Sequence, residues 1–257
     1  MATDSNIILS FSGVEKSFGG LLVIDDVTFD VARARRTALI GPNGAGKTTI
    51  FNLICGIYDI DRGTISLDGA DITHVPTRDR IAHGLSRSFQ NIRLMPHLST
   101  VENVMLGQHV RARGMAELFK PLGWASGRHW ARQAEDSLAR FGIETYPGQV
   151  VASLPYGVRK RIEVVRAMMA EPKLLLLDEP AAGLNSQETE ELQTLLRQVS
   201  DEGVTLLVVE HDMHFVRRLC EQVIVLNFGR KIFEGTPEEV HRDPAVLEAY
   251  LGTDDAA

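Results

Sequence analysis

The sequence lacks the long apolar runs that would carry it across a membrane. None of its apolar stretches approaches the roughly 20 residues that a membrane-spanning helix needs. The first ten residues, MATDSNIILS, contain no basic segment followed by an apolar core, so we expect no secretory signal peptide. Any role at a membrane is therefore expected to depend on docking against another chain.

Basic charge and cysteine are also scarce. The 257 residues include 27 Lys and Arg against 34 Asp and Glu, which gives a formal net charge of −7. A general nucleic-acid-binding surface needs the opposite balance, so we expect no nucleic-acid partner. The two cysteines, Cys55 and Cys220, lie among apolar residues of expected helices, which predicts reduced thiols in the core.

The chain shows no internal repeats, and its patterns indicate one α/β unit with an inserted segment. Short alternating strands are expected in the first third. Helical patterns fill the middle, and the continuous apolar runs Lys173–Leu177 and Thr205–Val209 then predict strands of a buried parallel sheet. We expect a single domain over 1–257, with an α/β core from residues 1–90 and 173–257 and a helical lobe from residues 91–172.

The segment GPNGAGKT, Gly41–Thr48, matches G-x-x-x-x-G-K-[ST] at every specified position. It follows the apolar run TALI and precedes an expected helix, Thr48–Ile57. Its glycines let successive backbone N–H groups point at phosphate oxygens, and the helix presents its positive end. We expect Lys47 to reach the β- and γ-phosphates and the Thr48 hydroxyl to ligate Mg²⁺. The residues expected to bind nucleotide here are Gly41, Pro42, Asn43, Gly44, Ala45, Gly46, Lys47, Thr48 and Thr49.

An acidic pair ends the apolar run LLLLDEP. Asp178 is placed to hold Mg²⁺ through water, and the adjacent Glu179 to polarise an attacking water. No N-K-x-D guanine-reading motif occurs in the chain, which argues against a GTPase.

These motifs, in this order, resemble the ATP-binding subunit of an ABC transporter over nearly the whole chain. The resemblance implies an α/β fold: a P-loop NTPase (RecA-like) core with an N-terminal antiparallel β subdomain and an inserted helical lobe. It also implies three further roles. Phe18, in KSFGG, would stack on adenine; Gln90, in RSFQN, would reach the metal and the water; His211, in LLVVEHD, would contact the γ-phosphate.

The segment SLPYG resembles the family signature L-S-G-G-Q, which binds ATP held by the opposite subunit of a dimer. Leu154 and Gly157 match, whereas Pro155, Tyr156 and Val158 depart from it. Pro155 cannot supply the serine hydroxyl, and one lost hydrogen bond to a charged phosphate costs roughly 1.5–3 kcal/mol. Proline nevertheless suits a first helical turn, so we interpret the signature as working, with Tyr156 and Gly157 contacting the nucleotide. A heterodimer with one weaker site fits the same residues.

The basic run RKR follows the signature, at residues 159–161. We expect it to be a solvated basic face and assign it no catalytic role.

Finer features resemble the branched-chain amino acid import subgroup: FQNIRLMPHLSTVENVMLG, EHDMHFV, FGRKIFEGTPEEVHRDP and the ending AYLG. The ATPases of urea and amide importers share many of these sequence features. The resemblance implies ATP hydrolysis that drives solute import from the cytoplasmic face of the cell membrane. It implies ATP and Mg²⁺ as cofactors. It implies as partners a second ATP-binding subunit, identical or different, membrane permease subunits and, indirectly, an extracytoplasmic solute-binding protein. The implied catalytic residues are Glu179, His211, Lys47 and Gln90, and the implied metal ligands are Thr48, Gln90 and Asp178.

Two other classes stay open at the level of sequence. A soluble ABC ATPase of DNA repair or translation normally carries long coiled coils or tandem nucleotide domains, and neither pattern is present. A regulatory module without turnover would not need Glu179 and His211. For the transporter reading, we expect the segment Asn91–His97 to contact a permease through Leu94 and Met95; the alternative is that these two side chains pack under the helical lobe.

Overall fold

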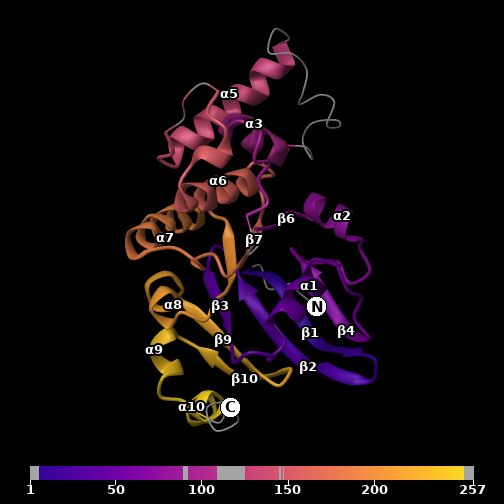
Figure 1. Cartoon of the computed structure of the whole chain (residues 1–257). Helices are drawn as coiled ribbons and strands as arrows, with labels where there is room; N and C mark the ends of the chain where they lie inside the picture. The colour runs from indigo at the N-terminus through magenta and orange to yellow at the C-terminus, as the bar shows by residue number, and fades with distance from the viewer. Residues whose placement is uncertain (1–5, 89–91, 109–124, 145, 147, 252–257) are drawn as a thin grey trace.

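The computed structural model describes residues 6–88, 92–108, 125–144, 146 and 148–251, and it contains two sheets (Figure 1). The first sheet is antiparallel, with strand order β2-β1-β4-β5. Its strands are β1 (Ile7–Phe18), β2 (Leu21–Ala32), β4 (Arg62–Leu67) and β5 (Ala70–Asp71). This is the antiparallel β subdomain that the family resemblance implied.

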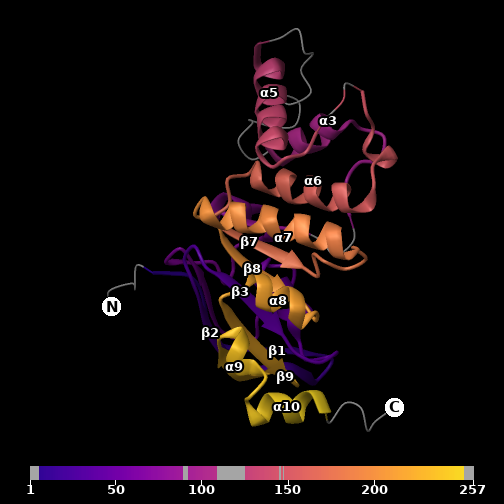
Figure 2. The ribbon, with the colours of Figure 1, turned by 90° about the vertical axis from the view of Figure 1, so that its left-hand side faces the viewer.

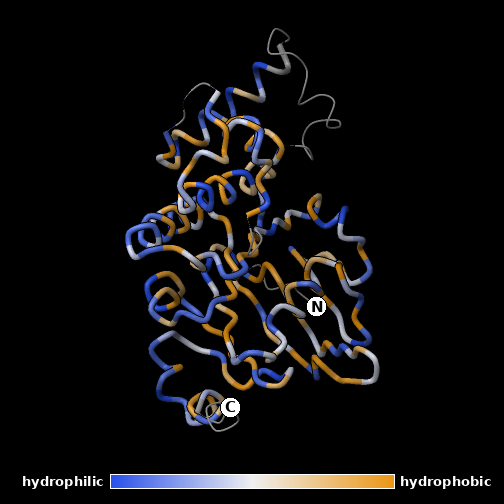
Figure 3. The backbone as a smooth tube through the Cα atoms, in the orientation of Figure 1, coloured by the Kyte–Doolittle hydropathy of each residue, from blue (hydrophilic) through white to orange (hydrophobic). Residues whose placement is uncertain are grey.

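The second sheet has the order β10-β9-β3-β8-β7-β6 and is parallel except for β10. Its strands are β3 (Arg36–Ile40), β6 (Leu85–Arg87), β7 (Leu174–Asp178), β8 (Thr205–Val209), β9 (Gln222–Asn227) and β10 (Arg230–Gly235). Every residue of β7 and β8 is buried, as continuous apolar runs in a parallel sheet should be. Hydrophobic residues accordingly concentrate along the central strands (Figure 3).

Helices cover this sheet and extend away from it. They are α1 (Lys47–Ile54), α2 (Thr77–Arg80), α3 (Thr100–Met105), α5 (Ala125–Arg140), α6 (Tyr156–Met168), α7 (Ser186–Asp201), α8 (Met213–Leu219), α9 (Pro237–Val240) and α10 (Pro244–Leu251), with 3₁₀ turns at Ile81–His83, Leu106–Gln108 and Val151–Ser153. In both views α3, α5 and α6 lie at one end of the molecule and α10 at the other (Figures 1 and 2). No helix among the described residues is long and apolar enough to cross a membrane.

The expected fold class is confirmed, and local signals placed most elements well. The predicted strand Thr205–Val209 is β8 to the residue. A capping box at Thr236 and Glu239, with Pro237 at the first helical position, starts α9 as the sequence indicates. Cys55 and Cys220 are free, buried thiols.

Three expectations need correction. Helix α1 ends at Ile54, because Cys55 and Gly56 turn the chain, so Ile57 is 48% exposed instead of joining the helix face. Leu94 is buried in the core beneath the helical lobe, and only Met95 is exposed. Lys160, which we expected on a solvated basic face, is 4% exposed because helix α6 turns it toward the core.

Candidate nucleotide-binding site

Three neighbouring parallel strands deliver the candidate residues to one edge of the sheet. Strand β8 lies between β3 and β7 and pairs with both. The phosphate loop follows β3, the acidic pair ends β7, and His211 comes two residues after β8. Because ligands of open parallel sheets bind outside the carboxyl ends of the strands, this edge is the expected place for a nucleotide.

The phosphate loop closes on itself. Lys47 Nζ donates hydrogen bonds to the backbone oxygens of Gly41 (2.7 Å) and Pro42 (2.9 Å). Gly41 has φ +152°, and a Cβ there would lie 2.2 Å from the Leu226 carbonyl oxygen. Gly46 has φ +102° and ends the loop, so α1 starts at Lys47 with its N–H groups facing the loop. The geometry is that of a phosphate cradle.

Lys47 is half-buried beside the two carboxylates of the acidic pair. Burial lowers the pKa of Lys47, and the charges of Glu179 and Asp178 raise it in part. Within the loop, Asn43, Gly44 and Thr48 are exposed, whereas Pro42 and Ala45 are buried. The loop therefore combines exposed residues with a cation that lies near the acids.

Asp178 is 7% exposed and is held by a cation that sequence reasoning missed. Arg87, at the end of β6, places Nη2 2.6 Å from Asp178 Oδ2. Its Nη1 donates to Asn52 Oδ1, on α1, at 2.8 Å. The arginine thus ties the acidic pair to the helix that follows the phosphate loop.

The donors present fit Mg²⁺. The contact with Arg87 uses Oδ2, which leaves Asp178 a second carboxylate oxygen for an ion or its bound water. The Thr48 hydroxyl lies in the exposed first turn of α1. Mg²⁺ prefers such oxygen ligands and retains several waters, so two protein ligands suffice. Gln90, the third expected ligand, lies outside the described residues.

Glu179 and His211 face each other across the end of the sheet. Glu179 has φ +44°, a conformation that non-glycine residues rarely adopt, and its N–H donates to Val209 O at 2.9 Å. Its Oε1 lies 3.9 Å from His211 Nδ1. Strained backbone of this kind gathers at functional sites.

Phe18 has an aromatic partner at the end of its strand. It is 39% exposed at the end of β1, and its ring meets Tyr58 edge-on, with centroids 5.0 Å apart. Lys16 Nζ lies 5.3 Å from the Phe18 centroid. An exposed ring held in this way suits stacking against a planar base; Tyr58 was not foreseen from the sequence.

The signature segment begins helix α6 and is held by another helix. Pro155 is the N-cap and makes no side-chain cap bond. Instead, the Gly157 N–H donates to Glu188 Oε1, on α7, at 3.2 Å. A Cβ on Gly157 would lie 2.7 Å from the Glu188 carboxylate, so this close approach needs glycine.

Comparisons with known proteins agree with this geometry. Residues 24–182 match the family model described as ABC transporter, and residues 230–256 match that of the branched-chain amino acid ATP-binding cassette transporter. The chain is 39% identical to the high-affinity branched-chain amino acid transport ATP-binding protein BraF of Pseudomonas aeruginosa, over 96% of this chain and 99% of that protein. The chain belongs to the ABC transporter family. It is an ABC-type ATPase, as this membership shows.

Two further similarities extend over nearly the whole ABC ATPase. The high-affinity branched-chain amino acid transport ATP-binding protein LivG of Escherichia coli is 36% identical, over 96% of this chain and 99% of LivG. The solved ADP conformation of MJ1267, an ATP-binding cassette of an ABC transporter, superposes with a TM-score of 0.84 at 26% identity and covers 96% and 99% of the two chains.

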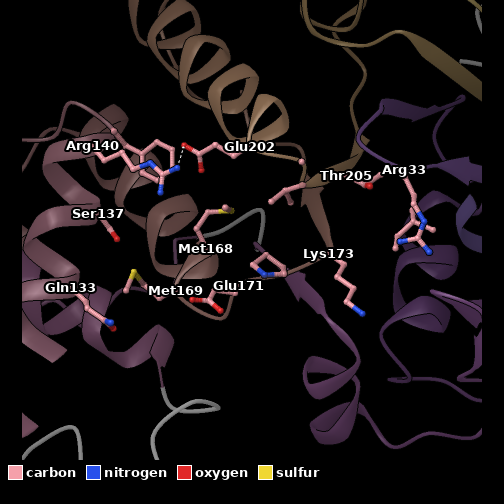
Figure 4. Close-up of a pocket in the computed structure, with 15 residues that line it drawn as sticks. Arg33, Gln133, Ser137, Arg140, Met168, Met169, Glu171, Lys173, Glu202 and Thr205 are labelled. Atoms are coloured by element: carbon pink, nitrogen blue, oxygen red, sulfur yellow. Dashed lines mark ion pairs between the residues drawn. The ribbon is translucent and has the colours of Figure 1, made fainter. Parts of the chain in front are cut away.

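This ABC ATPase has a cavity of about 680 Å³ (Figure 4), and no phosphate-loop residue is among those that line it. It opens where β7 and β8 begin, beside Lys173 and Thr205. Arg140, at the end of α5, pairs with Glu202 across it at 2.6 Å. Because it lies at the amino ends of the strands, it is not the nucleotide site.

Arg87, Tyr58 and Glu188 contact expected site residues and were missed by sequence reasoning. Arg87 and Tyr58 stand near expected motifs, in SRSFQ and GIYD, but nothing in their spacing marks their contacts. Glu188 is three residues after Asn185 and completes a capping box, the signal that predicts a helix start at α7. Its second contact, with α6, appears only in the folded chain.

Proposed function

We propose that this ABC ATPase drives the import of branched-chain amino acids as a peripheral subunit at the cytoplasmic face of the cell membrane. The relatives named above are named as branched-chain amino acid transport ATP-binding proteins, and the family model that matches residues 230–256 is that of the branched-chain amino acid ATP-binding cassette transporter. Urea or amide import is the alternative that the sequence leaves open. Uptake of labelled leucine and urea by the assembled transporter would decide between the two solutes.

The observation that carries the hydrolytic part is the meeting of Lys47, Asp178 and Glu179 at one sheet edge. Lys47 and the loop N–H groups would stabilise charge that develops on the γ-phosphate. Mg²⁺, bound by Thr48 and Asp178, would neutralise phosphate charge. Glu179 would accept a proton from the attacking water, and His211, 3.9 Å away, would contact the γ-phosphate.

Glu179→Gln tests this assignment. Losing the base should lower the ATPase rate by about 10²–10⁴ while ATP binding persists. Glu234→Gln is a matched control, because the side chain of Glu234 is 29% exposed and that of Glu179 26%, and Glu234 lies on β10 paired with Lys231. Near-normal turnover in the Glu179 variant, measured by phosphate release, would remove Glu179 from the mechanism.

We propose that a second ATP-binding subunit completes each site with Tyr156 and Gly157. Both residues lie at the start of α6 rather than at the phosphate loop of their own chain, so they need a partner's nucleotide. Adding ATP to the Glu179→Gln variant should then double the mass seen by light scattering. An unchanged mass would favour a different partner ATPase over a second copy.

We also propose that a permease segment docks in a groove of about 500 Å³ between the sheet and the helical lobe. Its lining includes Ile57, Ile81, Leu85 and Met95, and Met95 is 53% exposed. Ile57 is also exposed, at 48%, and neighbouring exposed apolar side chains of this kind are typical of a protein interface. Met95→Ser should weaken co-purification with the permease, whereas Leu247→Ser, at a similarly exposed site on α10, should not. Equal retention by both variants would place the docking surface elsewhere.

A further inference from the structure

Glu210 is a buried carboxylate for which neither the motifs nor the proposed mechanism has a use. It follows β8 directly and is 1% exposed. A carboxylate so far from water is destabilising unless hydrogen bonds and opposite charge compensate it. The contacts of Glu210 therefore indicate which parts of the fold it holds together.

The two oxygens of Glu210 hold two different loops. Oε1 accepts the N–H of Ala181 at 2.9 Å, two residues after Glu179. Oε2 accepts the N–H of His211 at 3.2 Å. One rigid carboxylate thus joins the backbone that follows the acidic pair to the backbone of the histidine.

Charged groups from the signature helix complete the surroundings. Lys160, on α6, is 4% exposed; burial lowers its pKa, and among the charges that raise it those of Glu163 and Glu210 have the largest effect. Burial also raises the pKa of Glu210, and the N–H groups of Ala181 and His211 lower it again. The carboxylate is therefore compensated from α6 as well as from the two loops.

Of the two side chains that these loops carry, the imidazole of His211 is the less enclosed by packing. The side chain of His211 is 68% exposed and that of Glu179 is 26% exposed, yet the two lie 3.9 Å apart. The position of the exposed imidazole must therefore depend largely on its backbone. Glu210 bonds to that backbone directly, and to the chain after Glu179 two residues on.

We propose that Glu210 is a positioning residue. By bridging the two loops, it holds Glu179 and His211 in the relative position that hydrolysis needs. The inference rests on the roles proposed above for Glu179 and His211. It assigns Glu210 no contact with nucleotide, because its buried carboxylate accepts hydrogen bonds from backbone N–H groups.

The test compares Glu210→Ala and Glu210→Gln in the full chain, by ATPase rate and by ATP affinity. A misplaced reacting group costs about 10²-fold, so Glu210→Ala should lower kcat by about that factor and leave ATP affinity within about threefold. Gln keeps one acceptor oxygen, so it should recover part of the rate. Asn103→Ala is the control: Asn103 is fully buried, accepts the N–H of Met95 and lies in the helical lobe.

A cycle with His211→Ala separates positioning from general damage. If Glu210 acts through His211, then Glu210→Ala should lower kcat much less in the His211→Ala background than in the parent. An equal loss in both backgrounds, or a similar loss in Asn103→Ala, would overturn the inference. If Glu179→Gln stops turnover but both Glu210 variants remain fully active, this inference fails while the proposed function stands.

Discussion

The phosphate loop and the start of the signature helix are both glycine-containing turns that open a helix, but they are held in different ways. Lys47 closes the phosphate loop by bonding Gly41 and Pro42 of the same eight-residue segment. The signature start is held from another element, because its Gly157 N–H donates to Glu188, 31 residues further along the chain.

This difference explains how far each segment can depart from its common pattern. A loop that closes on itself needs its own glycines and lysine, and here it matches at every specified position. A helix start whose N–H group is bonded by a side chain of another helix does not depend on a capping side chain of its own. Pro155 can therefore stand where the signature has serine without leaving Gly157 N–H unsatisfied.

The largest effect should come from breaking the self-contained loop. Lys47→Ala removes a cation from the phosphates, and charge-assisted bonds of about 1.5–3 kcal/mol correspond to a loss of ATP affinity of at least tenfold. The melting temperature without nucleotide should move by no more than about 4 °C, because Lys47 is only half-buried. Calorimetric titration and thermal melting measure the two quantities. A collapse of the melt without ligand would mean that Lys47 is mainly structural.

The same contrast shows what the sequence could and could not predict. The conformation of contiguous segments such as Gly41–Thr48 and Thr205–Val209 depends mainly on their own residues. The sequence therefore predicted the loop before a helix and the buried strand at these positions. Arg87 and Glu188 act through partners 91 and 31 residues away, and no spacing rule reveals such contacts.

The sequence also failed to predict that the charged side chain of Lys160 is buried. The run at residues 159–161 looked like a solvated face, because three adjacent cations usually are. On α6, however, neighbouring residues point 100° apart, so Lys160 turns to the core while Arg161 pairs with Glu191 at 3.1 Å. Helical geometry, rather than composition, decided which of the three is buried.

A moderate effect should come from Glu188→Ala. The variant removes the acceptor of the Gly157 N–H and one half of the capping box at Asn185, each of which typically contributes about 0.5–2 kcal/mol. The melting temperature should fall by several degrees, while ATP affinity of the single chain should stay unchanged, because Glu188 is remote from the phosphate loop. Glu191→Ala, on the same helix and without a cap contact among its described bonds, is the control. Equal melting of the two variants would mean that α7 does not support the signature.

The smallest effect should come from Pro155→Ser, which restores the common signature residue. Ser99 shows the geometry available: it is the N-cap of α3 at φ −65° and ψ 166°, and its side chain accepts Glu102 N–H. Pro155 has φ −53° and ψ 153°, so a serine there could also cap α6, by accepting the N–H of Gly157 or that of Val158. If the serine competes with Glu188 for Gly157 N–H, its gain should be nearly cancelled. Loss of the proline also stabilises the unfolded chain by about 0.4–1 kcal/mol through added conformational entropy.

Removing Glu188 should make the stabilisation by a serine at position 155 measurable. In the Glu188→Ala background the serine becomes the first side chain able to cap α6, so Pro155→Ser should stabilise the chain by about 0.5–1 kcal/mol more than it does in the parent. Urea unfolding of the four chains gives this coupling directly, provided that the slopes agree. A serine that helps equally in both backgrounds would show that Glu188 and residue 155 serve different N–H groups. The signature start would then be less dependent on α7 than its contact at Gly157 indicates.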